Sequence, residues 1–528
     1  MAQGARGAAR LAWAAAGLAG GGAGAALLEA PGVPPPPPGP PPPPGPPPPP
    51  PGAGAGGLRV VQAQVAFRHG ARTPLTKLYG ALEPEWRGTP PLEVAGGASA
   101  GGIPAKLVAL GSRGRAWPPP ASSVDVRQRA RPLPGGRFHA GELTPLGHAQ
   151  ARELGAWLRR RYGPGGEHPL VGAHFDPREV SARTTNVDRT FQTCAGVLAG
   201  LFPTPAGAGA GAGGGGAGGA TGEGGAPAPP SAPASPVVEV ETTEGEKEWL
   251  YPNSACCPRL ADLLKSRRAA LRSSKSAPLA ALEERALAAL GSDLAPPEGE
   301  RLDFIALYDA CTSRLAHGVG LPGHVTEELL REIEAEAAHV MAHLVSPTDV
   351  YSSDDAASSE EVLRLTAGRH LHEIVGHMED MAGQKGDSAA GLRLYSAHDT
   401  SLMPLLAALG RLEPGTWPPY TSFLVFELAC APPEEGGGHF VRALYNGEVV
   451  ERLPGAAGGD SATQPGGGWV PLADFQRALE PLLPRDFSAA CHAHLAATAG
   501  RDPTSAESAP GLDDSSARSD GTSQAKGG

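Results

Sequence analysis

An apolar segment, residues 58–67, runs directly into the sequence RHGARTP at residues 68–74, and this junction limits the folds open to the chain. The segment is rich in valine and other residues that favour β-structure, so it predicts a strand. The glycine and proline that follow predict a turn at the carboxyl end of this strand. Ligands of open α/β sheets bind at that end of the central strands. The sequence therefore predicts a buried central strand that ends at a ligand site containing His69.

Two arginines, Arg68 and Arg72, flank His69 in this segment. A guanidinium group presents a planar fork of N–H donors that matches phosphate oxygens, and it stays charged at every working pH. An imidazole nitrogen can attack phosphorus, so the segment fits transfer of a phosphoryl group to His69. The alternative is a structural histidine at a strand end, with solvated or ion-paired arginines around it. Arg-His-Gly alone does not decide between these two interpretations.

A second segment of the same kind lies far along the chain. Residues 392–397, with the sequence LRLYSA, predict another strand that leads into His398, Asp399 and an apolar stretch at 402–409. A histidine can donate hydrogen bonds to phosphate oxygens while a neighbouring carboxylic acid protonates a leaving alkoxide. His398 and Asp399 suit these two roles. The alternative is that they only cap the helix expected to begin near Thr400, because Asp is a favoured N-cap residue.

The segment 68–74 resembles the RHGxRxP signature of the histidine acid phosphatases. A third segment, residues 180–190 with the sequence VSARTTNVDRT, resembles the RSTDxxRT segment of the same family. The resemblance implies that Arg183 is a further phosphate ligand. Arg189, on the helix expected to follow, is predicted to form a structural ion pair with a neighbouring carboxylate.

The resemblance covers residues 58–494 and includes the sequence GELTPLG at residues 141–147. Two further segments, LYPN at 250–253 and WPP at 417–419, are most similar to the type 6, lysophosphatidic acid phosphatase branch of the family. Phosphoglycerate mutases share the fold, but their signature differs after RHG. The resemblance therefore favours a hydrolase over a mutase.

A mechanism follows from this resemblance. His69 is implied to be the nucleophile, and Asp399 the general acid that protonates the leaving group and then activates water. Four side chains are implied to hold the phosphate: Arg68, Arg72, Arg183 and His398. Asp399 must start protonated among cations that favour its charged form, so acidic pH is expected to help the first step. A bound phosphate dianion would act in the opposite direction, and the sequence leaves open which effect is larger.

The implied activity is a metal-independent phosphomonoesterase that uses no cofactor and converts lysophosphatidic acid to monoacylglycerol and phosphate. A broad-specificity acid phosphatase or a phytase-like enzyme stays open as an alternative within the family. An inactive member that binds phosphate or lipid is the alternative outside catalysis. The presence of all the implied site residues, His69 and Asp399 among them, argues against an inactive member.

Glycine and proline are abundant, with 74 and 58 copies in 528 residues, so much of the chain is not expected to fold. A Pro/Gly-rich linker, a Gly/Ala/Pro-rich insertion and a polar tail are expected to be disordered: residues 31–57, 204–236 and 497–528. The remainder, residues 58–496, predicts one α/β domain with a three-layer body around a mainly parallel sheet. A mostly helical cap is expected from about 75–140 and 245–345, with the active site between body and cap. Helical periodicity is predicted at 143–162, 190–202, 279–290, 324–344 and 360–381.

Histidines and cysteines give no metal site in this sequence. His370 and His372 are two residues apart on a predicted helix, so they point to different faces, and both are expected at the surface. No zinc site is predicted. The six cysteines lack CxxC spacing and define no disulfide framework in a chain of this size, and the roles of Cys256 and Cys257 stay open.

The formal net charge of −11 disfavours nucleic acid as a partner, and a small phosphorylated molecule, such as a lysophospholipid, is expected instead. No apolar run of membrane-spanning length follows the N-terminus, so the mature chain is not expected to cross a membrane. The basic segment 99–138 is interpreted as a solvated irregular loop, with attraction of anionic lipid or phosphate as the alternative. Peripheral contact of the chain with a membrane stays open. The oligomeric state is not predicted.

The N-terminal segment, residues 1–30, is interpreted as a targeting sequence. It is rich in alanine, contains Arg6 and Arg10, and has no acidic residue before Glu29, which suits a mitochondrial presequence. A signal for the secretory pathway or the lysosomal lumen is the alternative. The resemblance to the type 6 branch favours the mitochondrion.

Overall fold

The computed structural model describes residues 57–75, 86, 105–109, 122–135, 138–203, 237–273, 276–292, 294, 296, 301–346, 356–383, 390–435, 437–456 and 466–498. The predicted targeting segment, the insertion at 204–236 and nearly all of the linker and the tail lie outside the described residues. The predictions for these segments therefore stay predictions. No helix in the described part of the chain is long and apolar enough to cross a membrane.

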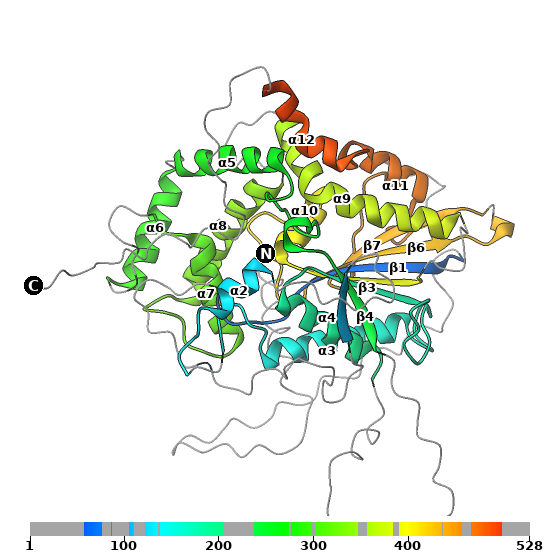
Figure 1. Cartoon of the computed structure of the whole chain (residues 1–528), viewed down its shortest axis with the longest axis horizontal. Coiled ribbons are helices and arrows are strands. Elements are labelled where there is room, and N and C mark those ends of the chain that lie inside the picture. The colour runs from blue at the N-terminus through cyan, green and yellow to red at the C-terminus, as the bar shows by residue number, and fades with distance from the viewer. Residues whose placement is uncertain are drawn as a thin grey trace, which may run out of the picture. The chain divides into compact units, whose positions relative to one another are not determined.

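Nine strands of the described residues form a single mixed sheet in the order β2-β4-β3-β5-β1-β6-β7-β8, with β9 paired to β7 (Figure 1). The strands are β1 (Arg59–Arg68), β2 (Ala105–Ala109), β3 (Val180–Thr184), β4 (Val238–Thr242), β5 (Leu392–Ala397), β6 (Phe423–Cys430), β7 (His439–Tyr445), β8 (Glu448–Val449) and β9 (Val470–Pro471). The half from β2 to β1 is parallel, and β6 pairs antiparallel to β1. Strand β2 belongs to the sheet although its residues fall within the range predicted for the cap.

The central position predicted for the first strand is confirmed. β1 lies between β5 and β6, and its parallel register with β5 places Arg68 beside Ala397. The backbone N–H of His69 donates to Ala397 O at 3.1 Å, which extends the pairing one residue past the strand. The carboxyl ends of the two predicted strands therefore meet at one edge of the sheet, with His69 next to His398.

Helices cover both faces of the sheet, as the three-layer prediction requires. On one face α3 (Pro145–Tyr162) and α4 (Asp188–Leu201) pack against Val65 and Phe67 of β1. On the other face α9 (Ala356–Ala382), α10 (Asp399–Ala408) and α11 (Leu472–Leu479) pack with Ala66 and Leu424. Successive side chains of a strand point to opposite faces, so the odd and even positions of β1 serve different layers.

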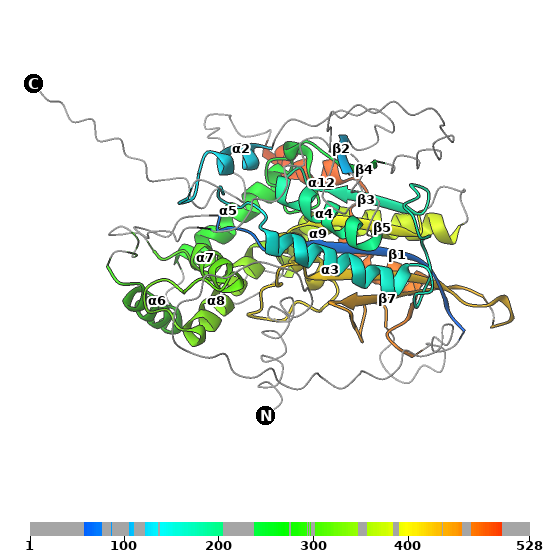
Figure 2. The same cartoon turned by 90° about the horizontal axis from the view of Figure 1, so that it is seen from below.

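A separate hydrophobic core holds the helical domain together. It is built from α5 (Pro258–Ser273), α6 (Ala277–Leu290), α7 (Phe304–Ala316) and α8 (Glu327–Val345), which lie together beside one end of the sheet (Figures 1 and 2). The prediction of a mostly helical cap is thus confirmed. Helices α5 and α7 were not among the helices predicted from the sequence. Short elements complete the chain: α2 (Ser123–Arg129), α12 (Phe487–Thr498), and the 3-10 turns η1 (Gly245–Lys247), η2 (Pro433–Glu435) and η3 (Glu480–Leu482).

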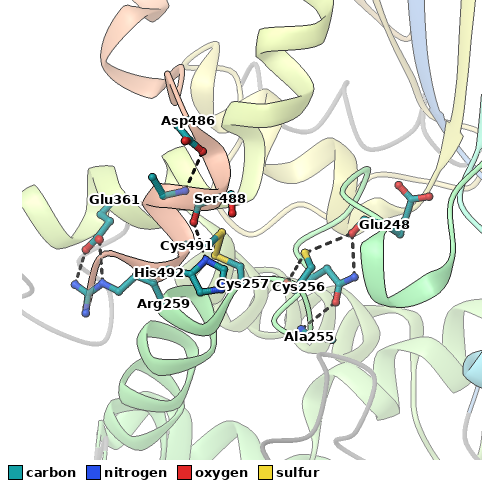
Figure 3. The surroundings of a disulfide bond; sticks show 12 residues. Glu248, Ala255, Cys256, Cys257, Arg259, Glu361, Asp486, Ser488, Cys491 and His492 are labelled. Carbon is teal, nitrogen blue, oxygen red and sulfur yellow. Dashed lines mark hydrogen bonds and ion pairs between the residues drawn. A yellow bond between two sulfur atoms is a disulfide. The ribbon is translucent and has the colours of Figure 1, made fainter. Parts of the chain in front are cut away.

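One disulfide joins distant parts of the helical domain. Cys257, which precedes α5, is bonded to Cys491 of α12, 234 residues away in sequence, and both are buried (Figure 3). The other cysteines, including the adjacent Cys256, are free thiols. Spacing in the sequence gave no sign of this pair, because only the packing of α12 on α5 brings the two sulfur atoms together.

The prediction that His370 lies at the surface is wrong. It is buried, with its ring 5.0 Å from that of Tyr395 and 5.9 Å from that of Trp249, whereas His372 is exposed as predicted. The two residues do point to different faces of α9, but the face that carries His370 packs on the sheet.

Close contact between α3 and α4 depends on Gly155. A Cβ at this position would collide with Val197 O and lie 2.8 Å from Leu201 N, and both are backbone atoms that cannot rotate away. We expect Gly155→Ala to lower the free energy of unfolding by about 1–3 kcal/mol, measured by urea denaturation. Gly376→Ala is the matched control, because no atom lies within 4 Å of the added methyl on α9. Equal stability of the two variants would contradict the prediction.

Candidate active site

His69 lies buried just past the carboxyl end of β1. Its Nδ1 is 2.9 Å from Gly70 O. A carbonyl oxygen only accepts, so this bond assigns the ring proton to Nδ1 and leaves the lone pair of Nε2 available. Burial lowers the pKa of His69 well below its usual value, and the charges of Arg189, Arg72 and Arg68 lower it further. The imidazole is therefore neutral at neutral pH, with the lone pair of Nε2 free to act as a nucleophile.

The turn that carries His69 is held against α3 by a close backbone contact. A Cβ on Gly70 would collide with Gly147 O, and a Cβ on Gly147 would collide with Ala71 O. The backbone N–H of Gly70 donates to Thr193 Oγ1 of α4 at 3.1 Å. Gly70 and Gly147, one from each of the motifs at 68–74 and 141–147, thus lie in contact. This contact and the hydrogen bond to Thr193 fix the loop that carries His69 on both α3 and α4.

Arg68 and Arg72 both reach the site, as predicted. Arg68 Nη2 lies 2.8 Å from Asp399 Oδ2, and its guanidinium carbon lies 4.4 Å from the centre of the Tyr420 ring. Arg72 Nη2 lies 2.7 Å from Asp309 Oδ1, which comes from α7. The Nε atoms of Arg68 and Arg72 are buried and make no hydrogen bond within the described part of the chain. Donors therefore remain for the oxygens of an anion.

The third arginine of the site is Arg189, contrary to the prediction. It is buried at the start of α4, where Nη2 lies 3.4 Å from His398 Nδ1 and Nη1 donates to Gln128 Oε1 at 3.2 Å. Its charge also lowers the pKa of His69. Arg189 thus faces the two histidines, whereas the sequence analysis gave it only a structural ion pair.

Arg183, predicted to bind phosphate, lies among carboxylates instead. Its Nη2 lies 3.0 Å from Glu248 Oε1, its Nη1 lies 3.4 Å from Glu373 Oε2, and its guanidinium stacks 3.7 Å from the centre of the Trp249 ring. Arg183 belongs to β3, and the alternation of the strand directs its side chain toward α9, which carries Glu373. These partners already neutralise the charge of Arg183, so the structure does not join it to the group around His69.

His398 stands beside His69, with ring centres 5.7 Å apart and the rings nearly perpendicular. Its Nδ1 faces the guanidinium of Arg189, which can only donate, so Nε2 carries the proton and donates to Thr185 Oγ1 at 3.1 Å. Burial and Arg189 lower the pKa of His398 well below its usual value. In the free site His398 is therefore a neutral ring.

Asp399, the first residue of α10, accepts hydrogen bonds on both carboxylate oxygens. Oδ1 accepts from the backbone N–H of Thr400 at 2.8 Å, and Oδ2 accepts from Trp417 Nε1 at 2.9 Å as well as from Arg68. Burial alone would raise the pKa of Asp399, but Arg68, Trp417 and Arg72 together lower it to about 2. In the free site the donors and cations around Asp399 therefore outweigh burial, and Asp399 is ionised.

Several side chains in this site had no assigned role in the sequence analysis. Trp417 belongs to the WPP segment and the ring of Tyr251, 5.5 Å from that of His398, belongs to the LYPN segment, so both lay in segments already noticed. Asp309 had no local signal, because its importance comes only from the packing of α7 on Arg72. In the described part of the chain no group of three or more histidine, cysteine or acidic side chains could hold a metal ion.

A hollow of about 470 Å³ lies at the opposite end of β1, where Arg59, Leu170 and Met381 are among its lining residues. None of the side chains around His69 lines it. The chemistry of the protein belongs at the other end of the strand, where a neutral imidazole, three arginines and a carboxylate lie together. This set can bind a tetrahedral oxyanion, supply a nucleophile and supply or accept a proton.

Several known proteins are similar to this chain. Lysophosphatidic acid phosphatase type 6 of Homo sapiens is 28% identical over 402 residues, which cover 75% of this chain and 79% of that protein. Prostatic acid phosphatase of Rattus norvegicus is 28% identical over 367 residues, 66% of this chain and 80% of that protein. The apo form of the Hafnia alvei phytase has a TM-score of 0.48 at 15% identity, covering 83% of this chain and 99% of that chain.

The family model of the histidine phosphatase superfamily, branch 2, matches residues 59–446. This match contains both histidines of the site and all three of its arginines. The resemblance noted in the sequence is confirmed, and the chain belongs to branch 2 of the histidine phosphatase superfamily and is a phosphoric monoester hydrolase.

Proposed function

We propose that the chain hydrolyses lysophosphatidic acid to monoacylglycerol and phosphate through a phosphohistidine at His69. The observation that carries the proposal is the state of His69: Nδ1 donates to Gly70 O, so Nε2 is unprotonated, and arginines surround the ring. A neutral imidazole nitrogen among fixed cations suits attack on the phosphorus of a bound ester.

In the first half of the reaction, Arg68, Arg72 and Arg189 hold the phosphate oxygens and neutralise their charge. Nε2 of His69 forms a bond to phosphorus while the bond from phosphorus to the ester oxygen breaks. Asp399 transfers its proton to that oxygen, so the product leaves as an alcohol rather than an alkoxide.

In the second half, water attacks the phosphohistidine and the bond from phosphorus to His69 Nε2 breaks. Asp399, ionised since the first half, accepts the proton of this water. Inorganic phosphate leaves, and both side chains return to their starting states. No other proton donor or acceptor is needed to balance the two halves.

Substrate binding supplies the reason for Asp399 to take up a proton. In the free site Arg68, Arg72 and Arg189 exceed the carboxylates of Asp309 and Asp399 by one charge, and the pKa of Asp399 is about 2. A phosphate dianion reverses the sign of this balance, so the pKa of Asp399 rises on binding. Asp399 therefore takes up a proton, from the substrate or from water, when the substrate binds. This is the proton that it later transfers to the leaving group.

Aromatic side chains next to the site support a lysolipid as the substrate. The ring of Tyr420 lies 6.0 Å from that of His69, Tyr251 lies against His398, and the ring of Tyr308 lies 5.4 Å from that of Trp417. A highly phosphorylated substrate would need additional cations for its other phosphates. Rings of this kind suit the uncharged body of a monophosphate instead.

The first test compares phosphate release from lysophosphatidic acid, phytate and an activated aryl phosphate by the full chain. We expect the highest kcat/KM with lysophosphatidic acid and a loss of at least about a thousandfold with His69→Ala on every substrate. His372→Ala, an exposed histidine on α9, is the matched control and should keep full activity.

The outcomes separate the parts of the proposal. Preference for phytate would overturn the substrate and leave the phosphatase activity intact. Substantial activity of His69→Ala would overturn the nucleophile.

A second test distinguishes the two arginines of the third motif. Arg189→Lys keeps the charge but loses the planar fork, so we expect kcat/KM to fall by about a hundredfold. Arg183→Lys should lower the free energy of unfolding by about 1–2 kcal/mol, because a single ammonium group cannot replace the fork that reaches both Glu248 and Glu373 and loses the stacking on Trp249. Its kcat/KM should stay within a few-fold of the wild type. Steady-state kinetics and urea denaturation of both variants give the answer, and the reverse pattern would contradict the assignment.

We also infer that the chain folds in an oxidising compartment. The buried Cys257–Cys491 disulfide supports this, because structural disulfides form and persist in such compartments. It favours the secretory alternative over the mitochondrial matrix. Alkylation of the unfolded, unreduced chain from its own cells should label four of the six cysteines, measured by mass. Labelling of all six would show that the pair is reduced in the cell and would contradict the inference.

A further inference from the structure

Trp417 lies in contact with Asp399. Its indole Nε1 donates a hydrogen bond of 2.9 Å to Asp399 Oδ2. The side chain is only 6% exposed, so the bond is shielded from water. Trp417 precedes the strand β6, and its next neighbour, Pro418, accepts a hydrogen bond of 2.5 Å from Arg68 Nη1 through its carbonyl oxygen.

The two oxygens of Asp399 differ in how they are occupied. Oδ2 lies 2.8 Å from Arg68 Nη2 and also accepts from Trp417, and both of these groups can only donate. A proton on Oδ2 would have to displace one of them. Among the described residues, Oδ1 accepts only from the backbone N–H of Thr400, so it can also carry a proton.

We propose that Trp417 is a positioning residue for the general acid: with Arg68 it occupies Oδ2 of Asp399 and leaves Oδ1 to carry and donate the proton. This inference rests on the proposed function, because it concerns the step in which Asp399 protonates the leaving oxygen. It adds the oxygen from which the proton departs and the side chain that selects it.

The helical domain holds Trp417 in place. Its ring packs against Tyr308 of α7, with ring centres 5.4 Å apart, and its backbone N–H donates to Glu334 Oε1 of α8 at 3.3 Å. Two helices of the cap thus hold the side chain that donates to Asp399.

Charged and titratable groups around this pair come from every neighbouring element: Arg68, Arg72, Tyr308, Glu334, His398 and Tyr420. None of them other than Arg68 donates to Asp399 Oδ2 through a side chain. Removing the indole N–H therefore takes away a donor to the carboxylate that no other of these groups replaces.

The test measures kcat against pH for Trp417→Phe with an alkyl phosphate such as lysophosphatidic acid. Without the donor the charged form of Asp399 is less stable, so its pKa rises and the fall of kcat at high pH moves upward by about one pH unit. The maximal kcat on the alkyl phosphate should drop about tenfold, because the proton is no longer confined to Oδ1. The burst rate with an activated aryl phosphate, whose leaving group needs no proton, should stay unchanged, and so should KM for the alkyl phosphate.

Two control variants separate loss of the N–H donor from poor packing of the phenylalanine side chain. Replacement of Trp417 by 3-benzothienylalanine exchanges the N–H for sulfur in a ring of the same shape, so it should repeat the effect even if the phenylalanine variant packs poorly. Trp469→Phe alters another buried tryptophan, stacked on Arg442 at 4.3 Å, and should leave the pH profile unchanged. An unshifted profile in the benzothienyl protein, or equal losses on alkyl and aryl phosphates, would overturn the positioning role. If His69→Ala were active, the proposed function itself would fail, whatever the result at Trp417.

Discussion

The buried ion pair between Arg68 and Asp399 connects the two strand ends on which the site is built. Arg68 is the last residue of β1, and Asp399 is the first residue of α10, which His398 joins to the end of β5. Removing one member of a buried pair leaves an unpaired charge that costs about 3–5 kcal/mol, so the pair holds the two ends in a fixed relation. That relation places the imidazole of His69 beside His398 before any substrate arrives. In the proposed reaction, the phosphate then meets a site that is already organised for in-line attack.

In the proposed mechanism, the same pair explains how one carboxyl group serves first as acid and then as base. Arg68 and Trp417 stabilise the charged form of Asp399 in the free site, where its pKa is about 2. The incoming phosphate competes for Arg68 and adds negative charge, so it favours the protonated form. Once the leaving group has taken the proton, the charged form is again the one that the surroundings stabilise. The favoured protonation state of Asp399 therefore changes with the charge of the molecule bound at the site.

The sequence predicts those residues of the site that lie at or just after the ends of predicted strands. His69, Arg68, Arg72, His398 and Asp399 each come within a few residues of a predicted strand, so the geometry of a parallel sheet brings them together. The choice between Arg183 and Arg189 could not be made in the same way, because it depends on which face of β3 and which turn of α4 meet the catalytic edge. For the fold, the central strand and the three layers follow from the pattern of apolar residues.

Other features depend on contacts that no local pattern contains. The pairing of Cys257 with Cys491 and the burial of His370 exist only because α12 and α9 pack where they do. Helix α5 also escaped prediction, because arginines and a lysine interrupt its apolar positions. In the folded chain Arg267 of this helix is buried and donates to backbone oxygens of His343 and Ser346, so a charged residue occupies a core position.

Helix α7 shows why the helical domain is part of the catalytic apparatus and not only a cover. Along this helix Tyr308 packs on Trp417, Asp309 binds Arg72, and Ser313 Oγ lies 3.1 Å from the hydroxyl of Tyr420. In the proposed mechanism, one helix therefore touches an arginine that binds phosphate, the tryptophan that orients the acid, and the ring that lies over Arg68. A shift of α7 would change phosphate binding and proton transfer together, because both depend on the same rigid element. The proposed catalytic set therefore includes side chains from the sheet edge and from the helical domain.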